Sequence, residues 1–119
     1  MSDFKITFYE KGNGEEPARL FLDSLNKKMR TKMVRTIVML GTNGTKLREP
    51  YSKPLEDGIF ELRAKFGSDI SRTLYFFYVG REIVLTNGFI KKTEQTPRGE
   101  IVKAKKYRDD FLARRVNRK

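Results

Sequence analysis

Two arginines and a pair of lysines have the side chains that phosphate chemistry needs. Arg63 lies in the alternating segment IFELRAK, and Arg72 follows nine residues later. Lys91 and Lys92 end the segment NGFIKK. A guanidinium binds two phosphate oxygens through a planar fork, whereas an ammonium is a compact charge that can also transfer a proton. Because crowded lysines disfavour one another's charged form, the four residues suit the binding and cleavage of a phosphodiester.

Tight turns between neighbouring strands would bring these residues together. A two-residue turn at Gly67-Ser68 pairs Arg63 with Arg72 across the hairpin. A two-residue loop at Gly80-Arg81 then places Arg72 beside Phe89, with the lysines just beyond that strand's end. Two arginines directly opposite each other repel unless an anion lies between them. This register is an assumption, because a slip of one residue turns a side chain to the other face of the sheet.

Each member of this group also has an ordinary structural explanation. A single arginine on a strand is more often solvated or ion-paired, and Glu61 could simply pair with Arg63. Adjacent lysines often protect an edge strand against aggregation. The basic side chains near the C-terminus are more readily explained as a solvated helix face than as ligands. The prediction therefore rests on convergence of the group.

Composition restricts the chemistry that is open to the chain. Its 119 residues predict a single domain, residues 1–119. The absence of Cys and His excludes thiol nucleophiles, disulfides, and the usual proton shuttle and metal ligand. Because a cationic site repels divalent ions, we expect no metal and no other cofactor. The formal net charge of +11 favours a polyanionic partner, which could be nucleic acid, an anionic membrane or an acidic protein.

The elements that must position these residues follow from the hydrophobic pattern. Residues 4–8 alternate like a strand, and Glu15-Glu16-Pro17 begins a helical stripe that forms one long helix or two helices meeting near Asn26. Residues 45–58 look irregular. Three strands with short turns then form an antiparallel meander. Thr96 and Pro97 begin a last helix with Ile101, Ala104, Tyr107 and Phe111 on its apolar face.

No membrane segment is expected. The N-terminus lacks the apolar core of a signal peptide. The longest apolar run, residues 74–79, is too short to cross a bilayer. We therefore expect a cytoplasmic protein.

Two long segments carry a family resemblance. The segments KPLEDGIFELRAKFGSDISRTLYFF and IVLTNGFIKKTEQTPRGEIVKAKKYRDDF resemble the RelE/HigB superfamily of toxins from type II toxin–antitoxin systems, in its phage-derived HigB-like branch. The resemblance covers nearly the whole chain. It implies an α+β, RelE-like fold in which N-terminal helices pack on a small antiparallel sheet, with a helix at the C-terminus.

The resemblance also implies an activity, which is metal-independent cleavage of messenger RNA in the ribosomal A site. Such an mRNA interferase inhibits translation and growth. The resemblance implies that Arg63 and Arg72 bind and stabilise the scissile phosphate, and that Lys91 and Lys92 face it. One of these lysines is the first candidate for the general base and Glu61 is the second. Three further residues are expected to contact RNA, namely Lys53, Lys65 and Thr93.

The implied partners are the ribosome with its messenger RNA and a cognate antitoxin. The antitoxin is expected to be a small helix-turn-helix protein, in a heterotetramer that binds operator DNA. Two other functions stay open on the same fold. One is a toxin without catalysis, such as a gyrase inhibitor, and the other is an accessory nucleic-acid-binding protein. Some superfamily members use a histidine near the site, which this chain lacks, so the assignment of general acid and base stays open.

Overall fold

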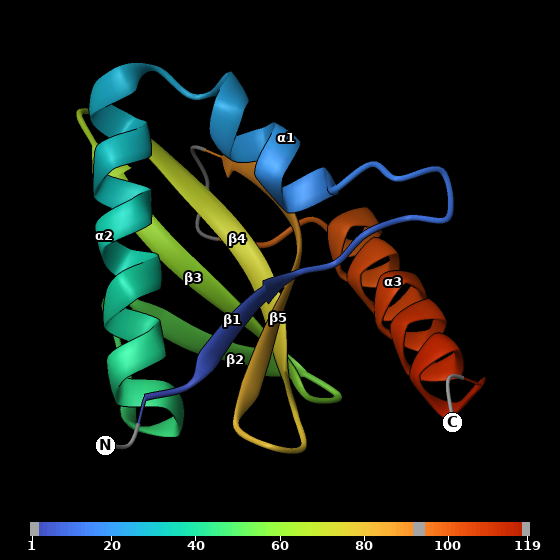
Figure 1. Cartoon of the computed structure of the whole chain (residues 1–119). Coiled ribbons are helices and arrows are strands. Elements are labelled where there is room, and N and C mark those ends of the chain that lie inside the picture. The colour runs from blue at the N-terminus through green and yellow to red at the C-terminus, as the bar shows by residue number, and fades with distance from the viewer. Residues whose placement is uncertain (1–2, 92–94, 118–119) are drawn as a thin grey trace.

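The computed structural model describes residues 3–91 and 95–117, which form a five-stranded sheet between two helical layers (Figure 1). Helices α1 (Pro17–Ser24) and α2 (Lys27–Asn43) cover one face of the sheet, and α3 (Arg98–Asn117) covers the other. The expected α+β architecture, with helices on a small sheet and a C-terminal helix, is confirmed. No helix in the described part of the chain is long and apolar enough to cross a bilayer.

The strands form a mixed sheet in the order β1-β5-β4-β3-β2. The predicted meander is confirmed as three antiparallel strands. The first strand, predicted from alternating residues, lies parallel to β5, so the sheet is not wholly antiparallel as expected. The bounds are β1 (Lys5–Phe8), β2 (Ser52–Glu56), β3 (Ile59–Phe66), β4 (Asp69–Tyr78) and β5 (Glu82–Lys91).

The prediction that residues 45–58 are irregular was wrong for β2, which pairs with β3. Pro54 obscured this strand because proline removes a ladder donor. A proline is tolerated at the sheet edge that β2 occupies, where one side of the strand has no neighbour. A 3-10 turn, η1 (Gly44–Lys46), connects α2 to this part of the chain.

The two hairpins differ in how well the sequence predicted them. The β3–β4 turn contains Gly67 and Ser68 as expected, and Gly67 has a φ of 65°, which favours glycine. The β4–β5 loop has three residues, 79–81, rather than two. A bulge at Thr86 compensates for the additional residue, because the register shifts between Leu74 and Tyr75. Beyond the bulge the pairing returns to the predicted one.

The helical stripe divides into two helices at Asn26, one of the two predicted alternatives. The Asn26 side chain accepts a hydrogen bond of 2.9 Å from the backbone N–H of Met29 and so caps α2. Arg30 donates to three backbone carbonyls at the end of α1, those of Leu22, Asp23 and Leu25. These contacts hold the two helices at an angle over the sheet (Figure 1).

Apolar cores lie on both faces of the sheet. The core under α1 and α2 contains Met29, Met33 and Leu40, with Leu62 and Tyr75 from the strands. The core under α3 contains the predicted apolar face of that helix, and its buried members include Ile101, Ala104 and Phe111. Together the cores rigidify the strands from both sides. The strand ends that carry the basic residues are thereby held in fixed positions.

Candidate functional site

Arg63 and Arg72 lie opposite each other across β3 and β4, as the turn length predicted. Both belong to the sheet face that α3 covers, because they share strand alternation with Ile59 and Leu74 of the core beneath that helix. Arg72 also pairs with Phe89 of β5, as expected. Two of the four predicted phosphate-binding residues are therefore brought together by the sheet.

The carboxylate of Glu61 lies between the two arginines. Arg63 Nε donates a 2.7 Å hydrogen bond to Glu61 Oε2, and Arg72 Nη1 lies 3.6 Å from the same oxygen. The hydroxyl of Thr96 donates to the other carboxylate oxygen. The anion needed to relieve repulsion between facing arginines is thus supplied by the protein itself.

The three ionic residues differ sharply in their access to solvent. The side chains of Glu61 and Arg72 are 0% exposed, whereas that of Arg63 is 17% exposed. Of this group, only Arg63 can touch a ligand without rearrangement. Glu61 fixes the guanidinium of Arg63 through the hydrogen bond from Nε, and Arg72 pairs with the same carboxylate. The two arginines and one carboxylate carry a formal charge of +1.

A groove of about 320 Å³ opens over the arginines. Lys65, one of the predicted RNA contacts, is exposed and lines this groove, and its role stays a prediction. Among the described residues, the lining consists of two arginines, one lysine and three uncharged residues, namely Pro50, Tyr51, Arg63, Lys65, Ile70 and Arg72. Its size and its charge suit a phosphate with part of its nucleotide.

The other predicted basic residues fall at the margin of this groove or outside the described residues. Lys53 lies in β2 rather than in a loop, and its backbone pairs with that of Glu61, but its exposed side chain does not line the groove. The backbone of Lys91 ends β5 and pairs with Ile70, which does line the groove. The side chain of Lys91, and all of Lys92 and Thr93, lie outside the described residues, so their roles stay predictions.

Sequence reasoning missed the contribution of the segment before β2. The carbonyl of Tyr51 accepts a 2.8 Å hydrogen bond from the backbone N–H of Arg63, which brings the Tyr51 ring to the groove. An aromatic residue beside Pro50 was the available signal, but the proline made the segment look irregular. Thr96 was predicted to cap the last helix, yet its hydroxyl bonds to Glu61. Pro97 precedes the first helical residue and accepts from the N–H of Glu100.

Polar contacts fasten α3 to the sheet beside the site. Asn87 Nδ2 of β5 donates to Glu100 Oε1 over 2.9 Å. Glu56 of β2 accepts from Arg98 Nη1 at 2.5 Å and from Lys105 Nζ at 2.6 Å. The hydrogen bond from Arg98, and then that from Lys105, lower the pKa of Glu56 to about 2. These bonds hold the segment that carries Thr96 near the arginines.

Most basic side chains on the predicted basic face of the last helix form ion pairs with acidic side chains. Arg115 Nη2 lies 2.9 Å from Glu82, and Arg108 Nη2 lies 3.0 Å from Asp57. Lys105 pairs with Glu56, and Arg114 pairs with an aspartate one turn away on the helix. The face was expected to be solvated, whereas the structure shows several of its cations partly buried in ion pairs. Its charges contribute to packing on the sheet.

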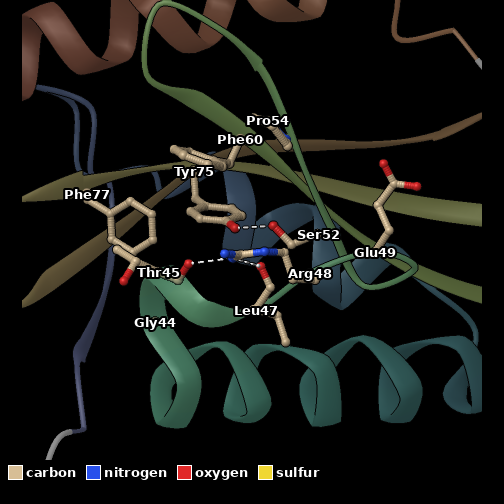
Figure 2. Close-up of a pocket in the computed structure, with 10 residues that line it drawn as sticks. All are labelled: Gly44, Thr45, Leu47, Arg48, Glu49, Ser52, Pro54, Phe60, Tyr75 and Phe77. Carbon is tan, nitrogen blue, oxygen red and sulfur yellow. Dashed lines mark hydrogen bonds between the residues drawn. The ribbon is translucent and has the colours of Figure 1, made fainter.

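A second hollow, of about 270 Å³, lies on the other face of the sheet near the end of α2 (Figure 2). Its polar groups satisfy one another, because Arg48 donates to the Thr45 carbonyl over 2.9 Å and the Ser52 hydroxyl meets that of Tyr75 at 2.5 Å. Burial raises the pKa of Tyr75 to about 12, so this phenol stays protonated at neutral pH. None of the predicted site residues lines the hollow, which we assign to packing.

Residues 3–91 and 95–117 contain no cluster of side chains that could coordinate a metal ion. No three acidic side chains gather there closely enough to hold an ion. Glu61 is instead committed to two arginines and a hydroxyl. A reaction without metal remains a prediction.

The chain matches the phage-derived Gp49-like proteins (DUF891) over residues 20–109, well over half of its length. It belongs to the Gp49-like family. The matched range begins within α1, ends within α3 and includes the three ionic residues of the site. No curated protein matches the chain.

Gp49-like proteins are associated with the toxins of toxin–antitoxin systems. A toxin of this kind implies an antitoxin partner in general. The matched residues include Lys53, Lys65 and the segment from Lys91 to Thr93, so every predicted site residue lies within the family region. The HigB-like branch and the ribosomal target remain predictions.

Proposed function

We propose that this Gp49-like protein is the toxin of a type II toxin–antitoxin system and cleaves messenger RNA on the ribosome without a metal. The observation that carries the proposal is the facing pair Arg63 and Arg72, held by buried Glu61 beneath a cationic groove. A preorganised guanidinium in a partly dry groove stabilises negative charge far better than a mobile one in water. The backbone of Lys91 ends β5 beside this groove, which is where a second source of positive charge is needed.

The chemistry that we assign to the groove is attack by a ribose 2′-OH on the adjacent phosphorus. The new P–O2′ bond forms as the P–O5′ bond breaks, which leaves a 2′,3′-cyclic phosphate and a 5′-OH. A base must accept the proton of the 2′-OH, and an acid must deliver one to O5′. Arg63 contacts the phosphorane oxygens and is the catalytic residue that the groove presents. Arg72 supports it from behind.

The two proton-transfer roles are assigned to Lys91 and Lys92, in an order that stays open. Glu61 was the second candidate for the base. Its burial and its bonds to Arg63 and Thr96 favour a positioning role, because both carboxylate oxygens already accept hydrogen bonds. Lys65, Lys53 and Thr93 are proposed as further RNA contacts. Lys65 lines the groove and Lys53 does not, whereas Thr93 lies outside the described residues.

A toxin without catalysis is the second candidate function. The specific observation in its favour is that Arg72 and Glu61 are fully buried and form an ion pair. A buried ion pair of this kind can also have a purely structural role. Such a protein would inhibit growth by binding a target, as gyrase inhibitors do. The two functions differ in whether message is cut.

Primer extension on messages isolated after induction in cells separates the two. The wild-type protein should yield discrete cleavage sites, and Arg63→Ala should abolish them, because loss of one preorganised contact costs about 10²–10³ in rate. Lys91→Ala/Lys92→Ala should behave likewise. Arg115→Ala is a suitable control, since Arg115 pairs with Glu82 at the opposite end of the sheet. Growth inhibition without any cleavage would favour the binding function.

The proposed partner is a small helix-turn-helix antitoxin, with two copies of each chain in a complex that binds palindromic operator DNA. A cationic toxin gives an acidic antitoxin a fast encounter, and the cytoplasm is the proposed compartment. Co-expression with the product of the neighbouring gene tests this. If that product neither co-purifies nor relieves toxicity, the antitoxin proposal fails, whereas the cleavage proposal is judged separately by primer extension.

A further inference from the structure

A second cationic surface lies on the outer side of α2, away from the groove. It surrounds a shallow depression of about 420 Å³. We call it the α2 patch and define it by five helix residues and one ring from the β3–β4 hairpin, namely Lys27, Lys28, Thr31, Lys32, Arg35 and Phe66. All six side chains are exposed.

The cations of the α2 patch are not neutralised by the protein. Within the described residues, no carboxylate lies within 4.0 Å of the charged groups of Lys27, Lys28, Lys32 or Arg35. The cations of α3 differ, because six of them in the described residues pair with acids of the strands, of the β2–β3 turn or of their own helix. Helix α2 itself contains no acidic residue. The patch therefore presents a charge of +4 to solvent.

The position of these lysines opposes helix stability. Lys27 and Lys28 are the first two residues of α2, and the first turn contains no acid. The N-terminus of a helix carries a partial positive charge, so cations there are unfavourable. Capping does not explain them, since Asn26 already supplies the cap. A bound anion at this place would offset the cost.

An aromatic ring lies among the cations. Phe66 is 37% exposed, and the Nζ atoms of Lys28 and Lys32 lie 5.8 and 5.9 Å from its ring centre. An exposed ring beside a row of cations is the arrangement with which proteins bind single-stranded nucleic acid, where bases stack and phosphates meet charge. Lys28, Lys32 and Arg35 are spaced by about one helical turn, so they form a row along the helix.

We infer that the α2 patch is a docking surface for single-stranded RNA, with Phe66 as a stacking platform and Lys27, Lys28, Lys32 and Arg35 as phosphate contacts. Phe66 ends β3 one residue after Lys65, which lines the groove on the opposite face. The β3–β4 turn lies beside the N-terminal end of α2 (Figure 1). An RNA strand that rounds this hairpin would thus touch both surfaces. The inference concerns binding and does not require the proposed cleavage.

The test uses the full chain and a fluorescein-labelled 2′-O-methyl oligoadenylate of 12 nucleotides, which lacks the free 2′-OH that cleavage needs. Fluorescence anisotropy measures Kd over a series of salt concentrations. The patch variant is Lys27→Gln/Lys28→Gln/Lys32→Gln. The matched control is Lys5→Gln/Lys46→Gln/Lys106→Gln, which removes the same charge from exposed lysines outside the patch.

The patch variant should bind more than tenfold more weakly than the control, and its plot of log Kd against log salt should lose about 2 in slope, since each lost phosphate contact removes about 0.7. Phe66→Ser should weaken binding about fivefold or more without changing that slope. Thermal unfolding identifies any misfolded variant. Equal losses in the patch and control variants would overturn the inference. Binding of the same variants to poly-L-glutamate is measured in parallel. If the patch variant kept RNA binding and lost binding to poly-L-glutamate, the inference would also be overturned, because the partner would then be an acidic protein.

Discussion

Replacing Glu61 by glutamine tests whether the buried carboxylate organises the site. The substitution preserves the volume of the side chain and an oxygen that can accept from Thr96, so it creates no cavity. It removes the negative charge that lies 2.7 Å from Arg63 Nε and 3.6 Å from Arg72 Nη1. The two facing guanidinium groups then repel each other without this anion.

The expected loss of stability is large because the pair is buried. Glu61 and Arg72 are both 0% exposed, and removal of one partner from a buried ion pair costs about 3–5 kcal/mol. The entropy of unfolding is about 2.1 cal/mol/K per residue, or about 0.25 kcal/mol/K for this chain. The melting temperature should therefore fall by about 12–20 °C. Cleavage by the folded variant should fall as well, because Arg63 loses its fixed orientation.

Differential scanning fluorimetry in the absence and presence of sulfate measures both consequences. Sulfate mimics a phosphate, and its binding should return part of the lost stability, about 1.4 kcal/mol at a concentration ten times its Kd. Glu82→Gln is the matched control, since Glu82 is also a buried carboxylate paired with an arginine, Arg115. The control should lose stability without gaining sensitivity to sulfate beyond that of the wild type.

Two results would refute this reasoning. If Glu61→Gln melts within about 3 °C of the wild type, the charge contributes far less than a buried pair should. If the variant melts low but gains no more from sulfate than Glu82→Gln does, the arginines are not a phosphate site. Full cleavage activity in the folded variant would contradict the positioning role of Glu61.

Two further predictions concern stability. The pKa of Glu56 is lowered from 4.5 to about 2 by hydrogen bonds from Arg98 and then Lys105, so its contribution to stability is complete above about pH 4.5 and is lost as the pH falls toward 2. The melting temperature of Glu56→Gln should therefore vary less over this range than that of the wild type, and parallel curves would contradict the assignment. Lys27→Gln/Lys28→Gln should raise the free energy of unfolding by about 0.6–2 kcal/mol at low salt, because it removes two cations from the positive end of α2; a fall would show that these lysines stabilise the fold.

Much of the fold was readable from the sequence because local patterns determine local structure. Alternation predicted the strands of the meander. The apolar stripe left two alternatives, one long helix or two helices meeting near Asn26, and the structure has the second. Gly67, which can adopt a positive φ, predicted the length of the β3–β4 turn. Turn length determines register, so the pairing of Arg63 with Arg72, which was predicted on the assumption of a two-residue turn, is confirmed.

Long-range contacts were not readable in this way. The edge strand β2 was missed because Pro54 hides its pattern, and the parallel partner of β1 lies about 75 residues away along the chain. The Arg72–Phe89 pairing was right although the loop length was wrong, because the bulge at Thr86 compensates for the additional loop residue. No local rule predicts that compensation.

Within the candidate site, the sequence by itself determined which side chains share one face of the β3–β4 hairpin, since strand alternation and turn length are local properties. Only the tertiary structure decided which of them a ligand can reach. Arg72 and Glu61 are buried in contacts with distant segments, because Thr96 bonds to Glu61 and the residues before β2, Pro50 and Tyr51, line the groove with Arg72. Exposure depends on segments far apart in the chain, and those segments leave Arg63 and Lys65 at the surface of the groove.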